Sequence, residues 1–186
     1  MIFRAFFFCF FLLVHCAAVA QNGRYEIRSG SIAFRSDAPL ELIEAKSTEL
    51  RGLIEPESGK FAFSVAIRTF QGFNNPVQKE HFNENYMESN DFPSATFAGK
   101  IIEDVDFSKN GIYSVRAKGK LKIHGVEQER IIKSEMIVKD GKLSVNAVFS
   151  VLLNEHKINI PKIVYQKIAE EIQITVAADF EPASQK

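Results

Sequence analysis

The fold class is decided by residues 114–123, which read Ser114-Val115-Arg116-Ala117-Lys118-Gly119-Lys120-Leu121-Lys122-Ile123. Every second residue from Val115 to Ile123 is apolar or small, and the residues between them are lysine or arginine. A spacing of two places successive side chains on opposite faces of a β-strand, whereas a helix would distribute these charges around its surface. The stretch therefore predicts a strand with one apolar face and one face in water.

The same alternation occurs in four further segments, each of which is predicted to be a strand with one apolar face. Three less regular segments, 25–34, 42–47 and 95–102, complete the set of expected strands. Successive hairpins of this kind, at this chain length, predict an all-β, mainly antiparallel fold, either a closed barrel or a sandwich. The apolar faces of the four regular segments consist of Phe61, Phe63, Val65 and Ile67; of Ile132, Ser134, Met136 and Val138; of Leu143, Val145, Ala147, Phe149 and Val151; and of Ile172, Ile174, Val176 and Ala178.

Turn and helix signals separate the strands. Asp140-Gly141 is typical of a tight hairpin turn, because its left-handed backbone suits these two residues. Asn75 and Pro76 predict the start of a helix that ends near residues 89–91, since asparagine caps helices and proline suits their first position. A second short helix is expected over residues 161–169. Glu80, Glu84 and Glu88 are spaced four apart, which predicts a solvated helix face.

The first twenty residues have the three parts of a secretory signal peptide: a basic start ending at Arg4, an apolar run over 5–14, and Ala18-Val19-Ala20 as a cleavage site. The apolar run is shorter than the about 20 residues that a membrane-spanning helix needs. We therefore expect a signal peptide over residues 1–20 and one mature domain over 21–186. Cleavage near Ala20 would make the mature protein periplasmic or secreted, with no integral membrane span.

Both cysteines, Cys9 and Cys16, lie within the predicted signal peptide. The mature chain is therefore expected to have no disulfide, no catalytic thiolate and no cysteine metal ligand. Cys16 leaves one alternative open, a lipoprotein whose anchor is attached there, although His15 stands where such signals have a small residue.

The charges of the chain are balanced, with 23 basic and 23 acidic residues. Proteins that bind nucleic acid need a basic surplus, so we expect no nucleic-acid partner. The spacing of His81, His124 and His156 matches no compact ligand motif, so we predict no metal site and no cofactor. His124 is interpreted as a turn residue that hydrogen-bonds its own hairpin, and His81 is expected where the helix meets the barrel.

Catalytic motifs are missing from the sequence. It contains no nucleophile elbow, no phosphate-binding loop and no dinucleotide fingerprint. The predicted inner face also offers few polar groups. We therefore expect a protein that is not an enzyme.

Three local patterns resemble the YceI-like family. One is Glu80-His81-Phe82 followed by residues 87–97, which end in a Pro-x-x-x-Phe strand entry; the second is Gly119-Lys120-Leu121-Lys122-Ile123-His124-Gly125-Val126; the third is the N-terminal strand pair with Gly52 and Phe61. The resemblance covers nearly all of residues 24–180. The chain departs from the family in two places: residues 34–40 lack a histidine after the first strand, and residues 154–161 replace an arginine-containing pattern.

This resemblance implies a closed, lipocalin-like barrel of about eight strands with one or two short helices. It also implies a long-chain apolar ligand, such as a polyisoprenoid lipid, inside the barrel. From the residues alone, the small side chains at Ala117, Gly119, Ser134 and Ala147 could leave a void, or phenylalanine rings could fill it. Gly119→Phe is expected to block the cavity without disturbing the fold. The residues expected to line an apolar cavity are Phe61, Phe63, Val65, Ile67, Phe97, Val115, Ala117, Gly119, Leu121, Met136, Val145, Ala147, Phe149 and Ile174.

An alternative function remains open at this point. A packed, ligand-free barrel would instead serve as an envelope interaction or stress-response module, with Phe70, Phe73 and Tyr86 as its exposed working surface. The sequence also leaves open whether the barrel forms a homodimer.

Overall fold

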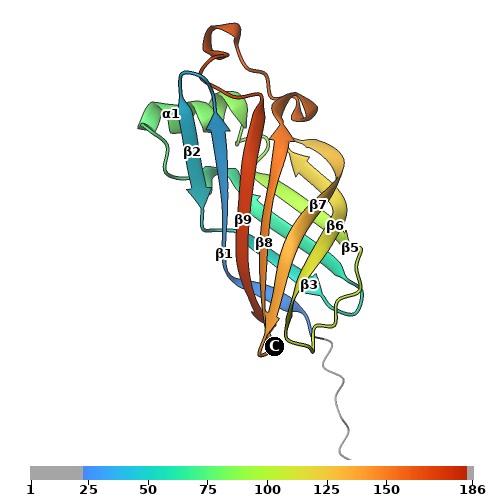
Figure 1. Cartoon of the computed structure of the whole chain (residues 1–186). Coiled ribbons are helices and arrows are strands. Elements are labelled where there is room, and N and C mark those ends of the chain that lie inside the picture. Colours follow the sequence, from blue (N-terminus) through green and yellow to red (C-terminus); the bar gives the residue numbers. More distant parts are fainter. Residues whose placement is uncertain (1–22, 184–186) are drawn as a thin grey trace, which may run out of the picture.

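The computed structural model describes residues 23–183, of which more than half lie in nine β-strands (Figure 1). All neighbouring strands are antiparallel, which confirms the predicted fold class. The strands are β1 (Tyr25–Asp37), β2 (Leu42–Ser47), β3 (Arg51–Glu55), β4 (Lys60–Ala66), β5 (Ser94–Ile101), β6 (Gly111–Ile123), β7 (Val126–Lys139), β8 (Lys142–Leu152) and β9 (Glu171–Pro182).

The sheet closes into a barrel because its first and last strands pair. The strand order is β2-β1-β3-β4-β5-β6-β7-β8-β9, with an additional pairing of β1 with β9. That pairing runs from Tyr25 opposite Pro182 to Arg35 opposite Gln173. Eight strands therefore form a closed wall and β2 is an extra strand, in agreement with the barrel of about eight strands expected from the family resemblance.

One edge of β1 is shared by two strands. β2 pairs with residues 32–37 of β1, whereas β3 pairs with Tyr25 and Glu26 only. The far edge of β2 is bordered by the segment after β4, because Lys46 and Gln71 exchange two backbone hydrogen bonds of 2.8 and 2.9 Å. The wall beside β2 is thus completed by a loop rather than by a strand.

The inner and outer faces of β6 follow the predicted alternation. Val115, Ala117 and Leu121 are buried, and the lysines and arginine between them are exposed. On the outside, Lys118 pairs with Glu129 and Lys120 with Glu127 across β7, at 2.9 and 2.7 Å. Such exposed ion pairs contribute little to stability. Burial of the inward apolar side chains is therefore the main reason why this strand adopts its register.

The predicted helix begins where expected. α1 (Pro76–His81) is capped by Asn75, whose side chain accepts a hydrogen bond of 2.9 Å from the backbone N–H of Gln78. It continues as a π-helical turn over Phe82–Tyr86. Glu80, Glu84 and Glu88 are exposed, as predicted. Figure 1 shows α1 and the loop between β8 and β9 at one end of the barrel, and the C-terminal end of β9 at the other end.

Both predicted hairpin turns are present. His124 and Gly125 have φ of 49° and 72°, and Asp140 and Gly141 have φ of 51° and 73°. Two consecutive residues in the left-handed region form the turn that matches the twist of antiparallel strands.

Two expectations about elements were wrong. Residues 161–169 do not form a helix; only a 3₁₀ turn, Lys162–Val164, is present, and Ile163 is 91% exposed. The short strand β3 was not expected as a separate strand.

No helix within residues 23–183 has the length and apolar character that crossing a membrane requires. The predicted signal peptide, Cys9 and Cys16 lie outside the described residues.

Candidate functional site

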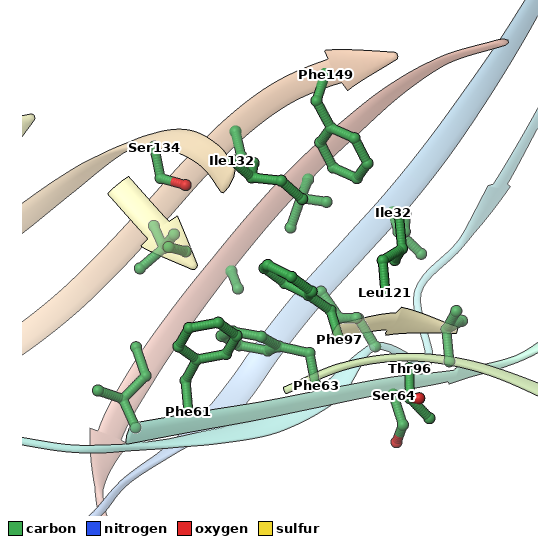
Figure 2. Close-up of a pocket in the computed structure, with 18 of the residues that line it drawn as sticks. Ile32, Phe61, Phe63, Ser64, Thr96, Phe97, Leu121, Ile132, Ser134 and Phe149 are labelled. Carbon is green, nitrogen blue, oxygen red and sulfur yellow. The ribbon is translucent and has the colours of Figure 1, made fainter. Parts of the chain in front are cut away.

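The interior of the barrel contains two adjoining cavities. The smaller one, here called the inner chamber, has a volume of about 110 Å³ and lies among the strands (Figure 2). Apart from the hydroxyls of Ser64, Thr96 and Ser134, its lining is apolar. The apolar lining residues are Ile32, Leu50, Ile54, Phe61, Phe63, Val65, Ala95, Phe97, Ile101, Val115, Ala117, Leu121, Ile132, Met136, Val145, Ala147, Phe149, Val176 and Ala178.

The larger cavity, here called the outer chamber, has a volume of about 450 Å³. It lies towards α1 and the β8–β9 loop, and it reaches the surface at exposed residues such as Val77 and Lys167. Sites for small molecules have volumes of about 300–1,000 Å³, so this chamber is of ligand-binding size. Its apolar lining consists of Ile32, Phe34, Ile43, Val65, Ile67, Phe70, Phe73, Val77, Phe82, Tyr86, Met87, Ala95, Leu121, Ile123, Phe149, Val151, Leu153, Ile158, Val164, Ile168, Ile172 and Ile174.

The two chambers adjoin each other along a shared wall. Five residues line both of them: Ile32, Val65, Ala95, Leu121 and Phe149. All five are apolar and come from strands β1, β4, β5, β6 and β8. An apolar chain that enters the outer chamber therefore meets only hydrocarbon where the inner chamber begins.

Phenylalanine rings close the inner end of this path. The ring of Phe61 lies 4.9 Å from that of Phe97 and 5.5 Å from that of Phe63, measured between centroids. Phe63 in turn meets Phe180 edge-on at 6.1 Å. Figure 2 shows the rings of Phe61, Phe63 and Phe97 gathered together, with Phe149 apart from them. We call Phe61, Phe63 and Phe97 the phenylalanine plug.

A second aromatic group forms the wall of the outer chamber beside β2. Phe34 on β1 packs against Phe70, Phe73 and Phe82 at centroid distances of 5.6, 5.9 and 5.2 Å. Because the barrel has no strand beyond β2 at this height, these rings shield the interior in place of a sheet. Sequence reasoning did not assign Phe34 or Phe82 to the cavity. Their only signal was the unusual number of phenylalanines, 17 in the whole chain.

Polar side chains of the outer chamber lie near its mouth. Gln78 donates a hydrogen bond of 2.9 Å to the carboxylate of Glu41, which ties α1 to the loop before β2. Asn75, His81 and Lys167 also line this chamber, and Ser36 accepts a hydrogen bond from the backbone N–H of Ala169. The mouth thus offers acidic, basic and neutral hydrogen-bonding groups. Within the described part of the chain, the inner chamber offers only three hydroxyl groups.

Most of the residues predicted to line the cavity do so. Phe61, Phe63, Phe97, Val115, Ala117, Met136, Val145 and Ala147 line the inner chamber, Ile67 and Ile174 line the outer chamber, and Val65, Leu121 and Phe149 line both. The small inward residues Ala117, Ser134 and Ala147 line the inner chamber, which is the smaller of the two cavities. The larger cavity is lined by strand residues together with residues of the helix and of the loops at that end of the barrel.

Gly119 is the exception. A Cβ atom at this position would lie 2.4 Å from the carbonyl oxygen of Ala98 and 3.1 Å from Cα of Gly99 on the neighbouring strand. Gly119 lines neither chamber; it permits the backbones of β5 and β6 to approach closely. The expectation that Gly119→Phe would block the cavity and spare the fold was therefore wrong.

His124 was also misinterpreted, because it does not bond its own hairpin. One ring nitrogen lies 3.1 Å from the carbonyl oxygen of His156, and the other lies 2.9 Å from a carboxylate oxygen of Glu88. His156 is fully buried and contacts the carbonyl oxygen of Val126 at 3.2 Å. These contacts join three separate loops. Within residues 23–183, no three histidine, cysteine or acidic side chains gather as metal ligands would.

The three aromatic residues that a protein-interaction module would expose are buried or half-buried. Phe70 is only 5% exposed, and Phe73 and Tyr86 are half-buried. All three line the outer chamber. Their aromatic rings face the interior because the loop that carries them completes the barrel wall.

Residues 14–180 match the sequence profile of the YceI-like domain. The chain belongs to the YceI-like family. A comparison with curated proteins gave no significant sequence match.

Solved structures from three bacteria share the fold. A polyisoprenoid-binding domain from Saccharophagus degradans, implicated in plant cell wall breakdown, superposes with a TM-score of 0.69 at 12% identity, over 86% of this chain and 98% of that one. BcnA from Burkholderia cenocepacia gives 0.67 at 13% identity, over 81% and 95%. The YceI protein of Campylobacter jejuni gives 0.59 at 15% identity, over 77% and 86%.

Proposed function

We propose that this YceI-like chain is an exported lipid-binding protein that holds an apolar ligand of the isoprenoid type inside its barrel. The observation that carries the proposal is the outer chamber of about 450 Å³. It adjoins the inner chamber where five apolar residues line both. The polyisoprenoid-binding domain of Saccharophagus degradans, which has the same fold, supports the ligand class.

The energetics favour a hydrocarbon ligand. Each methylene group that leaves water for an apolar cavity contributes about 0.8 kcal/mol, so a chain of several isoprene units binds without a strong polar anchor. An isolated charge in the depth of the cavity would lose its hydration without gaining a partner. The chemistry of the lining is therefore suited to binding an uncharged chain.

We propose binding rather than catalysis as the activity. The titratable groups that line the outer chamber are Glu41, His81, Tyr86 and Lys167, and they come from four separate segments of the chain. The end of the cavity away from these groups is apolar. Among the hydrogen bonds that these groups make within residues 23–183, none pairs a nucleophile with a base.

Export belongs to the same proposal. Residues 1–20 have the pattern of a signal peptide, and removal of this segment would deliver the barrel to the periplasm or the outside of the cell. An apolar lipid that is poorly soluble in water needs a carrier in such an aqueous compartment.

The proposal is tested by extracting lipids from the natively purified protein and identifying them by mass spectrometry. Ala95 lines both chambers, so Ala95→Phe is expected to fill the space between them and to reduce the recovered lipid at least tenfold. Ala98 lies on the same strand with its side chain exposed, so Ala98→Phe is the matched control and should retain the lipid. A wild-type barrel that carries no lipid after native purification, or an Ala95→Phe variant with unchanged lipid content and circular dichroism, would contradict the proposal.

A further inference from the structure

We infer that the ligand is a single-chain lipid with a neutral headgroup, of which the barrel encloses about twenty carbon atoms, and that the phenylalanine plug sets this limit. The inference rests on the proposed function and adds the size and the orientation of the ligand. It is argued from the volumes of the two chambers, the closed inner end and the charges at the mouth.

The chamber volumes fix the size of the enclosed chain. A cavity of about 150 Å³ holds benzene, which corresponds to about 25 Å³ for each carbon atom. The outer chamber, at about 450 Å³, thus has room for about 18 carbon atoms, and the inner chamber, at about 110 Å³, for about 4 more. A prenyl chain of three or four isoprene units fits this space, whereas a chain of eight or nine units requires about twice the volume.

The inner end offers no exit for a longer chain. Phe61 contacts both Phe63 and Phe97, and Phe63 contacts Phe180. Beyond these rings the barrel is filled by buried side chains such as Leu143 and Val138, which line neither chamber. The ring group seen in Figure 2 is therefore the floor of the cavity, and the chain end of the ligand stops there.

The mouth defines the other end of the ligand. Glu41, Gln78 and Lys167 line the outer chamber, and Glu41 already accepts a hydrogen bond from Gln78. Lys167 and His81 are the only basic residues of this lining within residues 23–183, and they share it with the carboxylate of Glu41, so the lining lacks the cationic cluster that recognises a diphosphate group. The ligand therefore lies with its hydrocarbon end at the phenylalanine plug and an uncharged polar group, such as a hydroxyl, at the mouth.

This arrangement predicts a chain-length optimum. Each methylene group that the protein encloses strengthens binding about fourfold relative to water. When the ligand is instead supplied from a lipid vesicle, every carbon atom that the barrel cannot enclose remains in water after transfer and opposes the transfer. Transfer should therefore be best for chains that just fill both chambers and much poorer for longer chains.

The experiment incubates lipid-free protein with phosphatidylcholine vesicles that contain a prenol, separates the two by gel filtration, and measures the protein-bound prenol by mass spectrometry. Geraniol, farnesol, geranylgeraniol, geranylfarnesol and solanesol, which have two, three, four, five and nine isoprene units, form the series. We expect farnesol and geranylgeraniol to be bound at least tenfold more than solanesol. Farnesyl diphosphate, as the charged counterpart of farnesol, should be bound at least tenfold less than farnesol.

A change in the plug should change the limit. Phe97→Ala removes six ring carbon atoms next to Phe61 and makes room for about one more isoprene unit, so the optimum should shift to a five-unit prenol. Leu143 is also buried, but it lines neither chamber. The chain length that the Leu143→Ala variant binds best should therefore be that of the wild type. If Phe97→Ala does not fold, Phe97→Leu makes a smaller enlargement at the same place.

The outcomes separate this inference from the proposed function. Strong binding of solanesol by the wild type, or an unchanged optimum in a folded plug variant, overturns the size limit while lipid binding stands. Equal binding of farnesol and its diphosphate overturns the neutral headgroup. Failure of every prenol to bind, together with the absence of extractable lipid, overturns the proposed function and this inference with it.

Discussion

The contact between Gly99 and Gly119 determines how closely β5 and β6 approach each other. The two glycines are directly opposite in the register of these strands. A Cβ atom on Gly99 would lie 2.0 Å from the carbonyl oxygen of Lys118, and one on Gly119 would lie 2.4 Å from that of Ala98. Because both obstacles are backbone atoms, no side-chain movement can relieve them.

We predict that Gly119→Val destabilises the protein by more than about 3 kcal/mol, since the strands must separate to admit the side chain. The free energy of unfolding, measured with urea, tests this. Ala98→Val, on the exposed face of the same strand pair, should change stability by less than about 0.5 kcal/mol. A Gly119→Val protein as stable as the wild type would show that the strands tolerate the extra atoms.

The buried imidazole of His156 makes stability depend on pH. Burial lowers the pKa of His156, and the backbone of Val126 and Ile123 and the carboxylate of Glu155 offset this only in part. The ring nitrogen Nε2 is buried and has no hydrogen-bond partner. The folded protein therefore favours the neutral ring, whereas the unfolded chain takes up a proton near pH 6.5. The stability that this neutral ring provides is fully present above about pH 6.5 and is lost as the pH falls.

We predict that the wild type loses up to about 1.4 kcal/mol of stability from this residue between pH 7.5 and 5.5. His156→Gln retains an N–H donor for the carbonyl of Val126 but cannot be protonated, so its loss over the same range should be smaller. Urea unfolding at both pH values measures the difference. His81→Gln, at an exposed position, is the control. Identical pH dependence of the wild type and His156→Gln would contradict the prediction.

Among the elements, α1 is a part of the cavity wall that polar contacts hold against the barrel. It is six residues long and none of its residues is buried. Asn74 donates a hydrogen bond of 3.0 Å to the carbonyl oxygen of Leu42, and Gln78 holds Glu41. Isolated helices of this length are not stable in water, so these ties and the cap at Asn75 keep α1 in place.

We predict that Asn75→Ala lowers the stability of this segment by about 1 kcal/mol, because the N–H of Gln78 loses its acceptor. Amide hydrogen exchange should become faster in residues 76–87, while exchange in β6 to β9 stays unchanged. Asn85→Ala, at an exposed position on the same segment, is the control. Faster exchange throughout the barrel would show that α1 does not open independently.

The strands whose apolar face could be predicted from the sequence are those with regular alternation, β4 and β6 to β9. β1, β2 and β5 alternate less regularly, and the sequence predicted only their positions. β3 has only five residues and buries just Ile54 fully, which leaves too little pattern to recognise. Residues 161–169 are apolar enough to suggest a helix, but Val164 and Ile168 line the cavity while Ile163 and Tyr165 are exposed.

At the scale of the whole molecule, the candidate site was only partly predictable. The inner chamber follows from the alternation of the strands, because inward residues of a barrel necessarily meet. The wall of the outer chamber beside β2 is formed by Phe34, Phe70, Phe73 and Phe82, which come from β1 and from a region without periodicity. Their meeting depends on how the chain crosses the free edge of β2, and no local pattern in the sequence specifies that crossing.

The seam between β1 and β9 has a consequence for how the protein is made. Ile32 lies opposite Val176, so the wall closes only when β1 and β9, which lie far apart in the sequence, meet. Contacts between positions this distant along the chain carry a loop-closure cost and slow the search for the native state to about milliseconds to seconds. During synthesis β9 leaves the ribosome after the other eight strands, so a growing polypeptide has no closed interior until β9 has emerged.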